Sequence, residues 1–186
     1  GANGITGSGI YLSSSPYFGA KAGSPITSSS SDVLIRQDYF HWSTTPPLIA
    51  TTGSLIIEPL NTSFSQTTVS TNLFTINHNS QVLGGYKLGK EGSTTPLTVN
   101  SAVSANGIIE YFGGNMTLSN TVSSSSDVKF TSSGAVTQSS GITADGLALL
   151  GSGNYTLTNT SNSINTIAAG TTMSSIGTLD IINSKA

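Results

Sequence analysis

The chain has 186 residues, a formal net charge of −2 and no cysteine, and only 8% of its residues are charged, against about 25% in an ordinary soluble domain. It contains 33 Ser, 26 Thr, 14 Asn and 21 Gly, which are poor helix formers and exclude a helical bundle. The small charge also argues against classical disorder. An all-β fold remains.

The same composition excludes several partners and sites. Six basic residues against eight acidic ones form no basic stripe, so nucleic acid is excluded as a partner. Without cysteine there are no disulfides or thiolate metal sites. No apolar run approaches the roughly 20 residues of a transmembrane helix, so we expect no transmembrane segment.

Short stretches of alternating apolar residues recur along the whole chain, each bounded by Gly, Asn, Ser or Pro. This period of two predicts β-strands, and no segment has the spacing of an amphipathic helix, so we expect no helix of any length. In chain order, the alternating pairs are Ile10/Leu12, Val33/Ile35, Phe74/Ile76, Leu97/Val99, Met116/Leu118, Val128/Phe130, Leu147/Leu149, Tyr155/Leu157 and Leu179/Ile181.

The strands follow a repeat of about 20 residues. LTVNSAVS begins at Leu97, MTLSNTVS one period later at Met116, and YTLTNTSN a further two periods later at Tyr155, so a skipped copy is expected near Ala135. A second series keeps the same period and consists of Ile108, Val128, Leu147 and Ile167. Two series with one period indicate a solenoid rather than a sandwich.

A repeat of this length with two or three short strands predicts a parallel β-helix with about 20 residues per coil. Inward positions take Ile, Leu, Val, Phe and Met, whereas turns and outward positions take Ser, Thr, Asn and Gly. At that length the chain holds roughly nine coils and forms a rod about 45 Å long. Open coil ends would pair with further strands, so we expect continuation into more coils or head-to-tail stacking on a second copy.

The repeat is regular in residues 85–186 and blurred in residues 1–84. The blurred part contains the Ser/Gly/Pro-rich stretch 13–31 and the consecutive prolines Pro46 and Pro47, which cannot donate to a strand ladder. We interpret residues 1–84 as β-helix coils with insertions, continuous with the regular coils of 85–186. A separate N-terminal sandwich is the alternative.

Residues 88–120, LGKEGSTTPLTVNSAVSANGIIEYFGGNMTLSN, resemble the repeats of large bacterial exoproteins of the filamentous haemagglutinin family. The resemblance extends through ITADGLALLGSGNYTLTNTSNSINTIAAG at residues 142–170, and back to SDVLIRQDYFHW and TTGSLIIEP. It implies a right-handed parallel β-helix, secretion through a dedicated partner pore, and a role in adhesion, surface fibres or biofilm. The Asn-rich start motifs of the family's secretion domain are not found, so we expect an internal stretch of a longer rod.

The densest group of chemically versatile side chains is RQDYFHW, residues 36–42. One interpretation is a glycan- or protein-binding platform, formed by Arg36, Asp38, Tyr39, His41 and Trp42. The alternative is structural. Strand alternation would place Ile35, Gln37, Tyr39 and His41 on one face and Arg36, Asp38, Phe40 and Trp42 on the other, with one aromatic set in the core and Arg36 paired with Asp38.

Catalysis is not expected, because the carboxylates are scattered along the chain instead of paired for acid/base chemistry. Glu91, Glu110 and Lys129 recur at the repeat interval and are interpreted as a column of surface ion pairs. His41 and His78 are far apart in the sequence and have no metal-binding pattern, so no metal or other cofactor is expected.

Asparagines suggest two further features. Asn120 and Asn159 occupy equivalent places in the repeat, which raises the option of a stacked amide ladder. Four residues lie in N-x-S/T sequons and are candidate glycosylation sites: Asn61, Asn115, Asn154 and Asn159.

These observations lead to one main functional expectation. We expect a non-enzymatic, stiff rod or filament segment of a secreted or cell-surface bacterial exoprotein. The alternative is an adhesin module that binds a host-cell or matrix glycan or protein through the segment 36–42.

Overall fold

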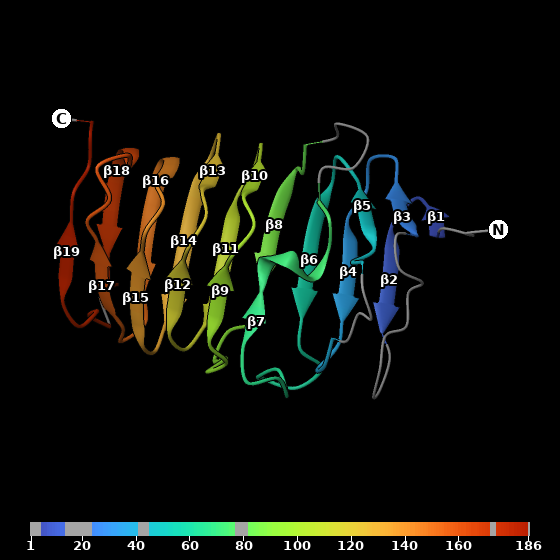
Figure 1. The fold of residues 1–186 in the computed structure, drawn as a ribbon, viewed down its shortest axis with the longest axis horizontal. Coiled ribbons are helices and arrows are strands. Elements are labelled where there is room, and N and C mark those ends of the chain that lie inside the picture. The colour runs from blue at the N-terminus through green and yellow to red at the C-terminus, as the bar shows by residue number, and fades with distance from the viewer. Residues whose placement is uncertain (1–4, 14–23, 41–44, 77–81, 172–173, 186) are drawn as a thin grey trace.

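The computed structural model describes residues 5–13, 24–40, 45–76, 82–171 and 174–185. Its strands stack side by side along one axis, with β1 (Ile5–Gly7) and β19 (Leu179–Ile181) at opposite ends of a rod (Figure 1). Neighbouring named strands pair in parallel, for example β11 (Ile109–Gly113) with β14 (Asp127–Ser132). The predicted all-β solenoid is therefore confirmed.

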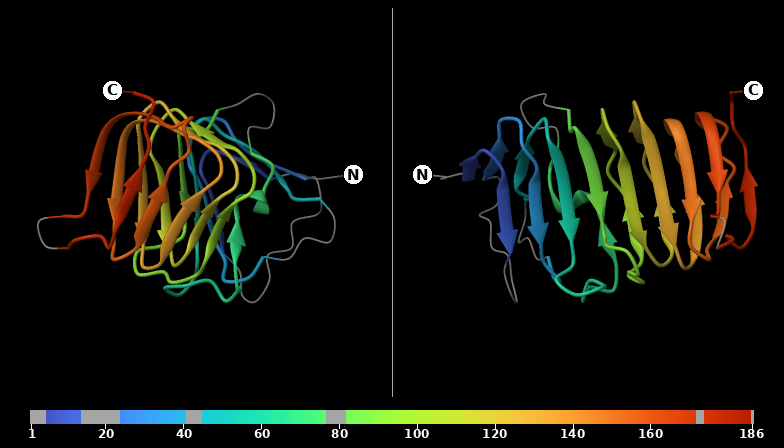
Figure 2. Two further views of the ribbon diagram at one scale, coloured as in Figure 1. Left: turned by 60° about the vertical axis from the view of Figure 1, so that its left-hand side comes forward. Right: turned by 180° about the vertical axis from the view of Figure 1, so that it is seen from behind.

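The strands form three sheets that wrap around the rod (Figure 2). The largest has ten strands and is called the long sheet. Besides β11 and β14 it contains β2 (Ile10–Ser13), β4 (Val33–Arg36), β6 (Ser54–Glu58), β8 (Gly85–Leu88), β10 (Val103–Ala105), β13 (Val122–Ser124), β16 (Ile142–Leu150) and β18 (Ser163–Ala169). It thus includes strands from both residues 1–84 and residues 85–186.

The other two sheets complete the coils. A six-stranded sheet consists of β7 (Val69–Ser70), β9 (Leu97–Val99), β12 (Met116–Leu118), β15 (Ala135–Gln138), β17 (Asn154–Leu157) and β19. A three-stranded sheet near the N-terminal end consists of β1, β3 (Pro25–Ser28) and β5 (Leu48–Ala50). Within the described residues the helical structure is one short 3-10 turn, Thr71–Leu73.

The register confirms the first repeat series and corrects the second. Leu97, Met116, Val136 and Tyr155 are paired in successive coils, so the skipped copy lies in β15 as expected. In the second series the partner of Val128 is Ile109, not Ile108. Ile109 is fully buried and Ile108 is 41% exposed, because a shift of one residue moves a side chain to the other face of a strand. Spacing alone does not distinguish neighbouring isoleucines.

The rod has about eight coils instead of the predicted nine, because its early coils are longer than the regular ones. In the regular part, Val128 of β14 pairs with Leu147 of β16 after a single short coil. Leu55 of β6, by contrast, pairs with Tyr86 of β8, which lies 31 residues further along the chain. A fixed coil length therefore overestimates the number of coils.

Inward side chains of successive coils stack into columns that form one continuous core. In the long sheet, one column runs Ile10, Val33, Leu55, Tyr86, Ile109, Val128, Leu147, and a second runs Leu12, Ile35, Ile57, Leu88, Tyr111, Phe130, Leu149. Tyr111 and Phe130 stack with ring centroids 5.3 Å apart and an interplanar angle of 10°. Tyr155 reaches across from the six-stranded sheet, and its hydroxyl donates to the Leu150 carbonyl at 2.6 Å. The two sheets thus share this core.

Asparagine or aspartate at the start of a strand links one coil to the next. The side-chain oxygens of Asp32, Asn115 and Asn154 accept a backbone N–H at the equivalent place one coil later, at 2.7, 2.9 and 2.9 Å. A glycine precedes each of the donating residues. A Cβ at Gly134 or Gly177 would collide with the Asn115 or Asn154 carboxamide, which explains why glycine is needed there.

Replacing Phe130 by Ala should destabilise the fold by about 3–5 kcal/mol, because it removes a fully buried ring and leaves a cavity beneath Tyr111. Thr131→Ala, which truncates the neighbouring outward side chain, is the control and should change stability by less than about 0.5 kcal/mol. Urea denaturation measures both. Equal effects would contradict the assignment of inward and outward columns.

Two buried tyrosines should respond oppositely to loss of their hydroxyl. The Tyr155 hydroxyl has carbonyl partners, so Tyr155→Phe should cost about 1 kcal/mol. The buried hydroxyl of Tyr111 has no hydrogen-bond partner among the described residues, so Tyr111→Phe should be neutral or stabilising. Thermal unfolding of the two variants gives the comparison, and a larger loss for Tyr111→Phe would contradict it.

Candidate functional site

The segment 36–42 leaves the long sheet where β4 ends at Arg36. Strand alternation continues through the buried Gln37 and then fails, because Tyr39 is 40% exposed and Phe40 is only 4% exposed. The predicted division into two alternating faces is therefore wrong at Tyr39 and Phe40, since a period of two applies only within a strand. His41 and Trp42 lie outside the described residues.

The Asp38 carboxylate joins this segment to the following coil by hydrogen bonds. Its carboxylate accepts the backbone N–H groups of Leu60 and Asn61 at 2.7 and 3.3 Å, and the Asn61 carboxamide at 2.8 Å. The predicted pair of Arg36 with Asp38 is wrong. Arg36 instead bonds Glu58 at 3.1 Å, because the parallel register places these two residues side by side in neighbouring coils.

Phe40 anchors the segment in the core. Its ring lies 6.1 Å from that of Phe64 and 6.0 Å from that of Phe74, the latter edge-on. The Gln66 carboxamide accepts the Phe40 N–H at 2.9 Å and donates to the Phe40 carbonyl at 3.0 Å. One aromatic of the segment is thus structural, as the core interpretation proposed.

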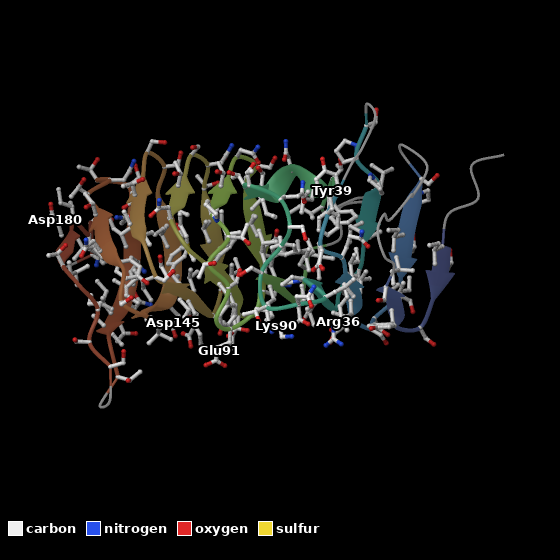
Figure 3. All side chains as sticks on the ribbon, turned by 90° about the horizontal axis from the view of Figure 1, so that it is seen from below. Arg36, Tyr39, Lys90, Glu91, Asp145 and Asp180 are labelled. Carbon is white, nitrogen blue, oxygen red and sulfur yellow. The ribbon has the colours of Figure 1, made fainter. Side chains whose placement is uncertain are left out.

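The described members of the predicted platform do not converge. Figure 3 shows Arg36 and Tyr39 on different sides of the rod, and Arg36 lies on the side of Lys90 and Glu91. The Asp38 carboxylate already accepts hydrogen bonds from Leu60 and Asn61 of the next coil. A single small ligand contacting Arg36, Asp38 and Tyr39 together is not supported by this geometry.

The outer surface of the long sheet instead carries a charge ladder, formed by Arg36, Glu58, Lys87, Glu110 and Lys129. Glu58 forms ion pairs with Arg36 and with Lys87, with N–O distances of 3.1 and 2.8 Å. Lys129 forms an ion pair with Glu110 at 3.3 Å. Lys87, Glu110 and Lys129 are register partners in successive coils. The predicted pair of Glu110 with Lys129 is confirmed, but Lys87 occupies the next place, where Glu91 was expected.

Glu91 lies in the exposed turn after β8. The regular spacing selects the wrong residue, because the coil that leads from Lys87 to Glu110 is longer than the coil that leads from Glu110 to Lys129.

Glu58 is the least exposed charge of this ladder, with its side chain 10% exposed. Burial would raise its pKa, but the hydrogen bonds and positive charges of Lys87 and Arg36 outweigh burial and lower the pKa below its ordinary value. The hydrogen bond to Glu58 correspondingly raises the pKa of Arg36. Glu58 is therefore ionised and held by two cations at neutral pH.

Aromatic rings lie beside two cations of the ladder. The Arg36 guanidinium is 5.9 Å from the centre of the Tyr11 ring, and the Lys87 ammonium is 5.3 Å from that of Phe112. Such cation–π contacts contribute about 0.5–1 kcal/mol at exposed sites. The ladder and its rings thus stabilise the stacking of neighbouring coils.

The described residues contain no cluster of three or more His, Asp or Glu side chains that could hold a metal ion. His78 lies outside the described residues, as does His41. None of the described segments forms a helix able to cross a membrane.

The four sequon asparagines differ in what their side-chain nitrogens do. The Nδ2 of Asn61 donates to Asp38, and that of Asn159 donates to the Ser139 carbonyl at 2.7 Å. Asn115 and Asn154 are exposed and use their oxygens in the hydrogen bonds between coils. The amide ladder that the sequence offered as one option for Asn120 and Asn159 does not occur among the described residues. Asn120 instead accepts the N–H of Thr121.

Sequence reasoning missed two polar features of the surface. One is an open groove of about 450 Å³ between the six-stranded and long sheets, lined by Thr121, Val122, Ser123, Ser139, Ser140, Gly141, Thr143, Asn159 and Ser161. The other is an outward column on the six-stranded sheet in which Thr98, Thr117, Thr137 and Thr156 are register partners. The signal was present, since each threonine follows the first inward residue of its repeat.

No protein-family model, curated protein or solved structure matches this chain. The class of protein that the fold defines is a β-solenoid. The resemblance to filamentous haemagglutinin repeats stays a prediction from the sequence motifs of residues 88–120 and 142–170.

The Glu58 contacts predict a dependence of stability on pH. A lowered pKa in the folded state stabilises the fold above the ordinary glutamate pKa of about 4.3, and this contribution is lost as pH falls through the lower folded-state pKa. Glu58→Gln should remove that part of the acid sensitivity. The measurement is the urea midpoint at about pH 6 and about pH 3.

Glu91→Gln provides the matched control, because Glu91 is exposed and has no ion pair among the described residues. It should keep the acid sensitivity of the unaltered chain. An identical loss of stability on acidification in the unaltered chain and in Glu58→Gln would contradict the prediction.

Proposed function

We propose that this chain is a structural segment of a secreted bacterial surface exoprotein, in which the solenoid serves as a stiff rod or filament unit in adhesion, biofilm or cell-surface structure. The observation that carries the proposal is the unbroken stacking of inward columns along the rod. In such a solenoid each coil contacts only its neighbours, so length can be added without changing the fold. The motifs of residues 88–120 and 142–170 support the placement at the bacterial surface.

The last described coil supports growth by stacking. Its inward residues Ile167 and Leu179 are each 40% exposed, whereas their column partners Leu147 and Tyr155 are 1% and 0% exposed. Further coils or a second copy, joined head to tail, would cover these side chains and pair the edge strands.

The adhesin alternative through residues 36–42 has less support. Arg36 is held by Glu58, Asp38 binds the next coil, and Phe40 is in the core. Tyr39 is exposed and on another side of the rod from Arg36 (Figure 3). We therefore favour the structural role.

Electron microscopy of the purified chain over a concentration series tests the proposal. We expect rods that lengthen by end-to-end addition as concentration rises. Ile167→Lys combined with Leu179→Lys should stop this lengthening, because two charges would be buried between coils. Ile108→Lys is the matched control, since Ile108 is 41% exposed but lies on the side of the rod, and it should leave lengthening unchanged.

Short rods of constant length would overturn self-assembly and leave an internal spacer. Compact particles without a rod shape would overturn the structural role itself. Lengthening that survives the double lysine variant would place the contact elsewhere on the rod.

A further inference from the structure

A short turn at residues 106–108 joins β10 to β11 in the long sheet (Figure 1). It contains the dipeptide Asn106-Gly107, and Asn106 is exposed. Asparagine is one of the thermolabile residues of proteins, because the main-chain nitrogen of the next residue can attack its side-chain amide. Glycine shields that nitrogen least, since it has no side chain. The turn therefore places a reactive carbonyl carbon next to an accessible nitrogen.

Both reacting groups are free of hydrogen bonds. Among the described residues, neither the Asn106 carboxamide nor the Gly107 N–H makes one. The main chain around them is held in place instead. The Asn106 N–H donates to the Leu83 carbonyl at 2.8 Å. The Gly107 carbonyl accepts the Ser124 hydroxyl at 2.7 Å. The Asn106 side chain can therefore rotate towards the Gly107 nitrogen without breaking a hydrogen bond, which is what an attack geometry requires.

Other asparagines that precede a small residue are held by the fold. The Asn183 carboxamide accepts the Ile164 N–H at 3.0 Å and donates to the Ile164 carbonyl at 2.9 Å. The Ser184 N–H donates to a main-chain carbonyl of the preceding coil at 2.8 Å. Both reacting groups of Asn100-Ser101 are bonded in the same way. Attack at these places would first require those hydrogen bonds to break.

Coil stacking keeps glycine at position 107. A Cβ at Gly107 would collide with the Gly84 carbonyl of the preceding coil. The residue that leaves the attacking nitrogen most accessible is therefore required by the fold itself. No such requirement applies to the Asn106 side chain, which makes no hydrogen bond among the described residues.

We propose that Asn106 is a self-modification site, at which the folded chain converts asparagine to aspartate and isoaspartate through a cyclic succinimide. The Gly107 nitrogen loses its proton to water and attacks Asn106 Cγ, so that an N–Cγ bond forms. The Cγ–Nδ2 bond then breaks, and ammonia leaves with a proton taken from water.

Water opens the succinimide in one of two ways. If it adds at Cγ, the new N–Cγ bond breaks and aspartate results. If it adds at the main-chain carbonyl carbon of Asn106, the original peptide bond breaks and the chain continues through Cγ as isoaspartate. Either way one water is consumed and one ammonia is released, so no oxidant, reductant or cofactor is needed.

The isoaspartyl product should weaken this part of the rod. It adds one methylene group to the main chain between β10 and β11. The Asn106 N–H bonds the Leu83 carbonyl, and Gly107 packs closely against Gly84. A longer main chain cannot keep both contacts and the strand register beyond them. Stability should therefore fall as the modification accumulates.

The test is incubation of the purified full chain at mildly alkaline pH, followed by peptide mapping with mass spectrometry and enzymatic methylation of isoaspartate. In the folded chain we expect conversion at Asn106 and none at Asn183. The rate should rise with pH, because the attacking nitrogen must lose its proton. A parallel incubation in urea breaks the hydrogen bonds of the fold and should add conversion at Asn183. Mapping separates these sites from Asn3-Gly4, which lies outside the described residues.

Asn106→Gln is the matched variant, because a glutamine side chain would have to close a larger ring. Thermal unfolding before and after incubation should show a loss of stability in the unaltered chain that is absent in Asn106→Gln. Circular dichroism checks that both remain folded during incubation.

Conversion at Asn106 in urea but not in the folded chain would mean that the fold protects the dipeptide, and would overturn the proposal. Conversion at Asn183 as fast as at Asn106 in the folded chain would also overturn it, because the free reacting groups would then make no difference. An equal loss of stability in the unaltered chain and in Asn106→Gln would overturn the assigned effect on the rod. These outcomes are independent of the filament experiment, which alters only the coil end.

Discussion

The structure depends on the in-register pairing of parallel strands from one coil to the next. Once Val128 lies beside Ile109 and Leu147, every inward residue is covered by its equivalents and every outward residue joins a surface column. This one constraint explains why a chain with few charged residues and half its length in Ser, Thr, Asn and Gly still has a continuous core. It also explains why glycines such as Gly134 and Gly177 sit beneath strand-start asparagines.

The same register gives the rod different surfaces. The long sheet aligns Lys87, Glu110 and Lys129 and brings Arg36 to Glu58, so opposite charges stabilise neighbouring coils. The six-stranded sheet aligns neutral hydroxyls instead. The outward residues of one sheet are not needed to pack the others, so each sheet can carry a different set of outward side chains. The proposed filament contact lies on neither face but at the coil end.

Much of the architecture could be predicted because the period of a solenoid is visible in its sequence. The series at Leu97, Met116 and Tyr155, and the missing copy near Ala135, match the observed strands. The errors are of one kind. The spacing selects Ile108 in place of Ile109, and Glu91 in place of Lys87. An approximate period allows a shift of one or more positions, whereas a shift of one position moves a side chain to the other face of a strand. In the candidate site, proximity in sequence favours Asp38 as the partner of Arg36, whereas the register pairs Arg36 with Glu58.

The sequence by itself determined the fold class, the coil length of the regular half and the core identity of residues such as Val128 and Phe130, because composition and periodicity are local properties of the chain. Only the tertiary structure decided that Arg36 forms an ion pair with Glu58 and that the Asp38 carboxylate accepts hydrogen bonds from the next coil. It also decided that Phe40 is buried while Tyr39 is exposed. Those facts depend on the register between coils and on where β4 ends. Because the coils differ in length, the sequence does not determine which residues of neighbouring coils are paired, and the strand pairing in the structure does.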